Sequence, residues 1–216
     1  MEKFAFFDVD HTITRHSTGR RFAFMGVRTG MFPRYPLLLI PFYYFFYRLG
    51  TMPVKKLARE IPYLKGRSFA EIHAVAMASF EKWVKKDIYP EAAALIAELQ
   101  SRGVRVVIAS SSLSVLIQPL ARHLGVTDII TSEAEFVGGY ATGGLRGFPA
   151  FGEEKKRFVE DFLEKNGGSP AECSFYSDSI NDLPLLEAVS HPVAVNPDMR
   201  LRRRARERGW RTLRFR

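Results

Sequence analysis

The chain has 216 residues, of which 46% are hydrophobic and 25% charged, with one cysteine and a formal net charge of +9. Its length suits one large domain or a core with an insert, and its balanced composition excludes the disordered, collagen-like and low-complexity classes. Cys173 has no second cysteine for an internal disulfide, and Asp8 interrupts the first apolar run, so we expect a cytoplasmic protein without a signal peptide.

Most of the positive charge lies at the C-terminal end. Residues 200–216 carry nine arginines against one glutamate, a net charge of +8, which leaves +1 for the other 199 residues. A nucleic-acid-binding protein normally spreads its basic residues over a whole face. We therefore expect no specific nucleic-acid partner.

Short apolar runs that end in small polar residues predict buried parallel strands. In chain order they are Phe4–Phe7, Val104–Ala109, the neighbourhood of Phe175–Tyr176, and Pro192–Val195. Helical patterns precede the second and third runs, from Pro90 to near Gly103 and over Lys155–Lys165, and Glu135–Gly147 has the glycines of a hairpin. Helix and strand in alternation indicate an α/β fold with a parallel sheet.

Residues 15–87 show helical patterns without strand signals. We predict a Rossmann-like core made of residues 1–14 and 88–216, with a helical cap, residues 15–87, inserted after the first strand. Within the cap, Tyr35–Tyr47 has no charged residue. As a helix it would span about 20 Å, less than the roughly 30 Å of a bilayer core. We expect a buried helix pair there, with an exposed interaction surface as the alternative.

Polar side chains follow each of the first three predicted strands. The first strand leads to Asp8-Val9-Asp10-His11-Thr12, the second to Ser110-Ser111-Ser112, and the third to Ser177-Asp178-Ser179-Ile180-Asn181-Asp182. Ligands of open α/β sheets bind beyond these strand ends. Four carboxylates at one edge would repel one another, so they predict a divalent cation, and oxygen-only ligands favour Mg²⁺.

The ordered set of an Asp-x-Asp-x-Thr motif, a strand-terminal Ser, a Lys and an Asp-x-x-x-Asp motif resembles the haloacid dehalogenase superfamily of aspartate-nucleophile phosphatases. The run from Tyr176 to Leu186 and the later Val195-Asn196-Pro197-Asp198 are similar to its phosphoserine-phosphatase-like branch, subfamily IB, which has a helical cap. The resemblance covers nearly the whole chain. It implies a Mg²⁺-dependent phosphomonoester hydrolase that acts on a small phosphorylated molecule.

The resemblance also implies roles for individual residues. Asp8 would be the nucleophile that forms an aspartyl phosphate, and Asp10 the general acid and base. Asp8, the Asp10 carbonyl and Asp178 would hold the metal, and Ser110 and Lys155 the phosphate, with Lys156 as the alternative to Lys155. Three further residues are expected to support the residues that bind the metal and the phosphate: Thr12, Asn181 and Asp182.

One position departs from the phosphoserine phosphatases. They carry a Glu nine residues after the nucleophile, where this chain has Ser17, so a carboxylate that would pair with the substrate amine is missing. Phosphoserine is therefore a doubtful substrate, and histidinol phosphate or a lipid phosphate stays open. His11 is expected to have a supporting or entrance role, and Cys173 to be a small core residue.

Two alternative functions remain at this point. A phosphomutase or phosphotransferase could use the same aspartyl phosphate with a sugar in place of water as the acceptor. A basic protein that binds membranes without catalysis is the other alternative. For the tail we expect a solvated helix over Leu201–Arg208 and an edge strand within Trp210–Phe215, with weak, salt-sensitive association with anionic membranes. The oligomeric state is left open.

Overall fold

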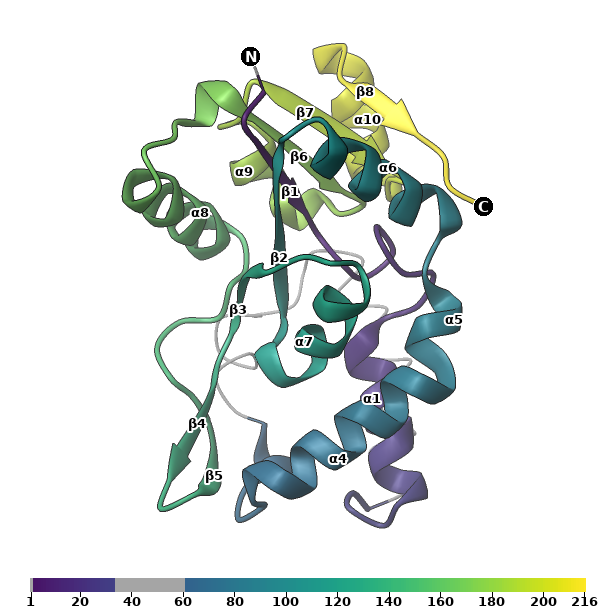
Figure 1. Cartoon of the computed structure of the whole chain (residues 1–216), viewed down its shortest axis with the longest axis vertical. Helices are drawn as coiled ribbons and strands as arrows, with labels where there is room; N and C mark the ends of the chain where they lie inside the picture. The colour runs from purple at the N-terminus through teal and green to yellow at the C-terminus, as the bar shows by residue number, and fades with distance from the viewer. Residues whose placement is uncertain (1, 34–60) are drawn as a thin grey trace.

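The computed structural model describes residues 2–33 and 61–216, and its centre is a six-stranded sheet. Figure 1 shows this sheet between two layers of helices. The strand order is β3-β2-β1-β6-β7-β8, and every neighbouring pair is parallel. The strands are β1 (Phe4–Phe7), β2 (Arg105–Leu113), β3 (Asp128–Ser132), β6 (Cys173–Ser177), β7 (His191–Val195) and β8 (Arg211–Leu213). Because β1 and β6 are buried on both faces, their sequences are apolar runs rather than alternating patterns.

Helices cover both faces of this sheet. On one face α6 and α7 pack on side chains such as Phe7 and Ile108, and on the other α8, α9 and α10 pack on side chains such as Phe6 and Phe175. These helices are α6 (Pro90–Ser101), α7 (Ser114–His123), α8 (Glu153–Lys165), α9 (Leu183–Leu186) and α10 (Met199–Arg208). Short 3₁₀ turns stand before β6 and α9, over Pro170–Glu172 and Ile180–Asp182. The molecule is thus a three-layer α/β/α sandwich.

The chain between β1 and β2 forms helices with a separate hydrophobic cluster. Phe22 of α1 and Ile72 of α4 meet there with Leu113 and Leu116. The described elements are α1 (Thr18–Arg28), a 3₁₀ turn (Pro62–Leu64), α4 (Phe69–Ser79), a π-helical turn (Phe80–Val84) and α5 (Lys85–Asp87). A two-stranded antiparallel hairpin also packs on this cluster and consists of β4 (Ala134–Val137) and β5 (Tyr140–Leu145).

The two points where this helical segment leaves and rejoins the sheet lie side by side. The Arg15 N–H donates to the Asp87 carbonyl at 2.8 Å, and Thr14 forms a β-bridge with Ile88. The Arg21 guanidinium then donates two hydrogen bonds, of 2.6 and 2.9 Å, to the Asp87 carboxylate. A bidentate ion pair of this kind fixes geometry as well as charge.

The predicted α/β fold with a Rossmann-like sheet is confirmed, and four predicted strands coincide with β1, β2, β6 and β7. Two features differ. Strand β3 was not predicted, because its sequence Asp-Ile-Ile-Thr-Ser has only two consecutive apolar residues. Strand β2 continues through the three serines to Leu113, after a register shift against β3 that begins at Ala109.

Two further expectations concern the helical segment and membranes. The boundaries of the cap, residues 15–87, remain a prediction, and Tyr35–Tyr47 lies outside the described residues. Over residues 2–33 and 61–216, no helix combines the length and apolar character needed to cross a bilayer.

Candidate active site

The turn after β1 places two carboxylates at the carboxyl end of the central strand. The Asp8 N–H donates to the Tyr176 carbonyl, which continues the β1–β6 ladder by one bond. The Val9 carbonyl then accepts from the N–H groups of Thr12, Ile13 and Thr14, at 2.9–3.2 Å. This tight turn requires a left-handed backbone at His11, whose φ is 64°. The turn is therefore closed by its own main chain.

Thr18 at the start of α1 fixes the side chain of Asp10. Its N–H and its hydroxyl each lie 2.8 Å from Asp10 Oδ1. The same hydroxyl is 2.9 Å from Ser112 Oγ at the end of β2. One oxygen of Asp10 therefore accepts both bonds from Thr18, and neither bond involves the other oxygen, Oδ2.

Lys155 joins the first and last sequence motifs. Its Nζ lies 3.0 Å from Asp8 Oδ1 and 2.7 Å from Asp182 Oδ1, and Asp182 Oδ2 accepts from Ser177 Oγ at 2.7 Å. Lys155 is only 2% exposed. α8 carries it into the site because Gly152 adopts a backbone with φ of 58° and ψ of −125°, which suits glycine. Lys156 instead faces Glu160 on the outer side of α8.

The charges of this cluster shift one another's pKa. Burial raises the pKa of Asp8 to about 7; Lys155 opposes this shift, while the nearby charges of Asp182 and Asp10 add to it. Burial alone would lower the pKa of Lys155, but the carboxylates of Asp182 and Asp8 raise it above its ordinary value. Lys155 therefore stays protonated near neutral pH, whereas Asp8 takes up a proton more readily than an ordinary carboxylate does.

The loop after β7 supports Asp178. The Asp198 N–H donates to the Asp178 carbonyl at 2.8 Å, and Asp198 Oδ2 accepts from the Ile180 N–H at 2.9 Å. Asp198 also caps α10, since its Oδ1 accepts from the Arg200 and Leu201 N–H groups. Asp178 itself is 3% exposed. The motif after β6 is thereby fixed to the last helix.

The donor set fits a divalent cation. Asp8, Asp178 and Asp182 are all buried, whereas Lys155 is the only buried cation in the described ranges 2–33 and 61–216, so negative charge is in excess. In those ranges no three His, Cys, Asp or Glu side chains gather where they could hold a metal ion. The predicted site needs only two side chains, those of Asp8 and Asp178, with the Asp10 carbonyl as a third oxygen donor. Mg²⁺ keeps several waters when so few protein ligands bind it.

The structure adds two contacts to the sequence argument. We expected a divalent cation to neutralise the four carboxylates, and Asp182 to support the waters or ligands of the metal. The structure shows that Asp182 pairs directly with Lys155, and that Asp10 turns one oxygen to Thr18. The contact between Lys155 and Asp182 could not be predicted from sequence spacing, because 26 positions lie between these residues.

The other predicted residues lie as follows. Ser110 is buried, and its Oγ accepts from the Ser112 N–H at 3.2 Å. Thr12 is fully buried, and its Oγ1 has no hydrogen-bond partner among residues 2–33 and 61–216. The Asn181 carbonyl lies 3.8 Å from the position that a Cβ on Gly152 would take. The individual roles of these residues remain predictions.

Three residues with secondary expectations have clear surroundings. Ser17 is the N-cap of α1 and accepts from the Arg20 N–H. His11 Nδ1 lies 3.0 Å from the Arg15 carbonyl. Cys173 is buried, and burial raises the pKa of its thiol to about 12, so it is an unreactive thiol.

Sequence reasoning missed two residues that position the site. Thr18 holds Asp10, and Ser177 holds Asp182. Thr18 follows Ser17, which the structure shows to be the N-cap of α1, and its spacing in the sequence gives no signal. Ser177 stands directly before Asp178 at a strand end, where a small polar residue could have indicated it.

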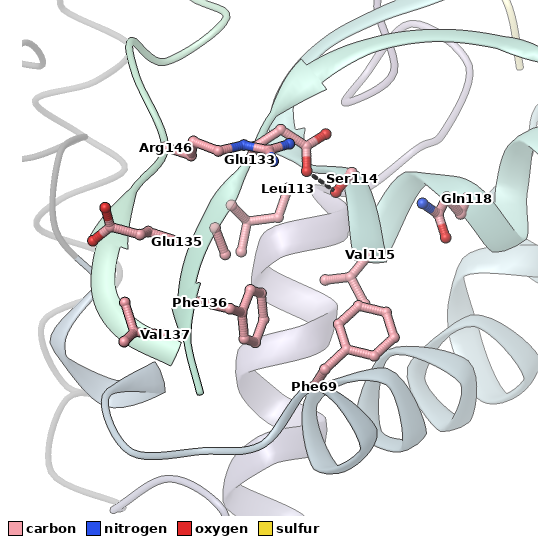
Figure 2. Close-up of a pocket in the computed structure, with 11 residues that line it drawn as sticks. Phe69, Leu113, Ser114, Val115, Gln118, Glu133, Glu135, Phe136, Val137 and Arg146 are labelled. Carbon is pink, nitrogen blue, oxygen red and sulfur yellow. Dashed lines mark hydrogen bonds between the residues drawn. The ribbon is translucent and has the colours of Figure 1, made fainter. Parts of the chain in front are cut away.

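A separate cavity of about 390 Å³ lies where β2 passes into α7 (Figure 2). Its lining includes the apolar side chains of Phe69, Leu113 and Phe136 and the charged side chains of Glu133 and Arg146. Ser114 donates to Glu133 at 2.7 Å across one side, as Figure 2 shows. None of the predicted site residues lines this cavity, so it does not belong to the carboxylate–lysine cluster.

Comparisons with known proteins agree with this geometry. A family model described as haloacid dehalogenase-like hydrolase matches residues 5–187. A probable phosphatase of Mycobacterium tuberculosis (strain ATCC 25618 / H37Rv) is 33% identical over 215 residues, which cover 98% of this chain and 75% of that protein. A phosphoserine phosphatase of the same strain is 33% identical over 98% of this chain and 70% of its own length.

Two further proteins are similar. A histidinol-phosphatase of Neisseria meningitidis serogroup C (strain 8013) is 34% identical over 79% of this chain and 74% of its own length. A crystal structure of a protein of unknown function from Bordetella pertussis Tohama I has a TM-score of 0.89 at 29% identity, covering 99% of this chain and 98% of that one. The likeness to that structure therefore extends over nearly the full length of both chains.

Proposed function

The chain belongs to the haloacid dehalogenase-like hydrolase family and is a phosphatase, and we propose that it hydrolyses a phosphomonoester of a small metabolite with Mg²⁺ and an aspartyl-phosphate intermediate at Asp8. The observation that carries the proposal is the buried bridge from Lys155 to Asp8 and Asp182. It supports the proposal because a carboxylate and a protonated amine lie together at the carboxyl end of the central strand. A transferring phosphoryl group needs both.

Asp8 and Asp10 divide the chemistry. A carboxylate oxygen of Asp8 attacks phosphorus in line, the bond from phosphorus to the substrate's alcohol oxygen breaks, and Asp10 gives its proton to that oxygen. In the second half, Asp10 takes a proton from water, whose oxygen attacks phosphorus and releases phosphate and the Asp8 carboxylate. We assign the proton to Asp10 Oδ2, because Thr18 occupies Oδ1 with two hydrogen bonds.

The metal and the phosphate have separate partners in this proposal. Asp8, Asp178 and the Asp10 carbonyl would hold Mg²⁺, which supplies positive charge beside the phosphate oxygens. Lys155 and Ser110 would bind those oxygens from the protein side. Asp182 and Ser177 orient Lys155, while Thr12 and Asn181 support the loops that carry the two motifs.

The substrate is proposed to be small and to be enclosed by the cap, residues 15–87. Relatives named phosphoserine phosphatase and histidinol-phosphatase point to phosphorylated amino-acid-like metabolites. Ser17 is committed to capping α1, which supports our expectation that phosphoserine is not preferred. A histidinol-type phosphate or a lipid phosphate fits the same chemistry. We propose a cytoplasmic location, where such metabolites occur.

Hydrolysis of an aryl phosphate tests the proposal. We expect turnover with Mg²⁺, loss of turnover in excess chelator, and recovery when Mg²⁺ is added back. Asp8→Asn should abolish turnover, whereas Asp161→Asn, on the exposed side of α8, should leave it unchanged. Acid quenching during turnover of a ³²P-labelled substrate should trap label on the wild-type chain only. Full activity in chelator, or in Asp8→Asn, would refute the mechanism.

A further inference from the structure

α10 and β8 lie at the edge of the sheet opposite β3 (Figure 1). Residues of both elements line a cavity that contains three arginines. Its volume is about 330 Å³, within the range of small-molecule sites. The guanidinium groups of Arg202, Arg206 and Arg214 line it, together with Thr212 and Asn196. No carboxylate is among its lining residues.

Five of the six arginines of α10, all but Arg200, fall into two groups. On one side of the helix Arg203 pairs with Glu207 at 2.9 Å, and Arg204 and Arg208 pair with Glu187 at 2.6 and 3.2 Å. On the cavity side, Arg202 and Arg206 are four residues apart and so lie one above the other. Within residues 2–33 and 61–216 neither of them forms an ion pair, and the same holds for Arg214. Like charges at this spacing destabilise a helix unless an anion neutralises them.

The cavity has a fixed frame. The Asn196 N–H donates to the Leu213 carbonyl, and Asn196 Oδ1 accepts from the Phe215 N–H, both at 3.0 Å. These two bonds flank Arg214 and hold it beside α10. Asn196 adopts a left-handed backbone with φ of 43°, and its buried Nδ2 has no partner among the residues that the structure describes. These hydrogen bonds fix the backbone beside the cavity, and they leave the Asn196 Nδ2 donor without an acceptor among the described residues.

We propose that this cavity binds a phosphate group as a dianion. Arginine forks match the spacing of phosphate oxygens, and three of them together with the Thr212 hydroxyl offer donors from two elements at once. Arg202 uses one nitrogen for the Pro197 carbonyl at 3.3 Å, which orients the guanidinium and leaves its other N–H groups for a ligand. The phosphate can come from a soluble metabolite or from the phosphomonoester headgroup of a lipid. This site contains none of the residues proposed for catalysis.

Arginine Nε–Hε signals in a ¹⁵N NMR titration test the site without reliance on activity. The probes are inorganic phosphate and pyrophosphate, with sodium chloride at matched ionic strength. The test variant is Arg202→Gln/Arg206→Gln. The control is Arg203→Gln/Arg208→Gln, which removes the same charge from the other side of the same helix. All four side chains are exposed, so we expect both variants to fold.

We expect phosphate or pyrophosphate to shift the Nε–Hε signals of Arg202, Arg206 and Arg214, with a dissociation constant at least tenfold higher in the test variant and within twofold in the control. Equal losses in both variants would show a general charge effect and overturn the proposal. So would signals that chloride shifts equally.

Flotation with vesicles distinguishes the two sources of phosphate. Phosphatidylcholine vesicles that contain phosphatidic acid are compared with vesicles that contain phosphatidylserine at the same negative charge. Binding that prefers phosphatidic acid and is lost only in the test variant supports a lipid headgroup. Binding of the soluble probes without this preference supports a metabolite. Absence of both refutes the site.

Discussion

Lys155 Nζ lies 2.7 Å from Asp182 Oδ1 and 3.0 Å from Asp8 Oδ1, so one buried ammonium group holds the nucleophile candidate and the last carboxylate of the final motif together. Removing this ammonium group leaves two buried carboxylates without their cation. We expect Lys155→Met to lower kcat/KM for an aryl phosphate by about 10²–10³-fold, the usual effect of losing one charged donor. Lys156→Met is the matched control, because Lys156 faces Glu160 outside the site. If Lys156→Met caused the larger loss, the assignment of Lys155 would be wrong.

Asp182 is expected to contribute to stability through the same contact. Asp182→Asn removes the closer of the two charges that neutralise Lys155, and the Asp182 side chain is buried. We expect the free energy of unfolding to fall by about 2–4 kcal/mol, because breaking a buried pair leaves an uncompensated charge. Urea unfolding at pH 7.5, with Asp161→Asn as the exposed control, measures the difference. A midpoint equal to that of the control would contradict the role of this ion pair.

Asp8 should make the metal-free protein less stable as the pH rises. The pKa of this carboxyl rises from its ordinary value of 3.8 to about 7 in the fold, so between these values the folded state retains a proton that the unfolded state has lost. Stability that this proton contributes is complete below about pH 4 and lost as the pH rises through 7. In chelator, we expect wild type to lose about 2–3 kcal/mol more than Asp8→Asn between pH 5 and pH 8. Parallel pH curves for the two proteins would disprove this assignment.

Gly152 should be required for activity because of its backbone. Its φ of 58° and ψ of −125° are unfavourable for any residue with a Cβ, and Lys155 stands one helical turn later. We expect Gly152→Ala to destabilise the protein by about 1–3 kcal/mol and to lower kcat as Lys155 moves. Gly167→Ala is the control, since Gly167 also has a positive φ, 65°, but follows the far end of α8. It should lower the melting temperature and leave kcat unchanged.

The sequence predicted those strands whose burial on both faces leaves a clear pattern, an uninterrupted apolar run. Phe4–Phe7 and the residues around Phe175 are strands buried on both faces, and their uninterrupted apolar runs show it. The carboxylates follow those strands directly, so their common edge could be expected. β3 lacks such a run, and its place at the sheet edge depends on pairing with Val107–Ala109.

The contacts made by side chains were less predictable. Thr18 contacts Asp10 from the first residue of α1, eight positions along the chain, and Lys155 contacts Asp182 from α8, which follows the positive-φ backbone of Gly152. Neither contact can be predicted from the residues near it in the sequence. The clustering of arginines after residue 200 was visible, but their division into paired and unpaired sides of α10 depends on where Glu187 lies in space.

Phosphoserine should be a poor substrate. A substrate amine needs a carboxylate partner when it is enclosed, and the position nine residues after Asp8 is Ser17, whose hydroxyl accepts from the Arg20 N–H at the start of α1. We expect kcat/KM for phosphoserine to be at least tenfold below that of the best monoester in a panel that includes histidinol phosphate, sugar phosphates, nucleotides and lysophosphatidic acid. All of these esters carry the same phosphate group, so differences in kcat/KM report on the rest of the substrate. Phosphoserine at the head of the panel would show that another residue neutralises its amine, and would overturn the significance given to Ser17.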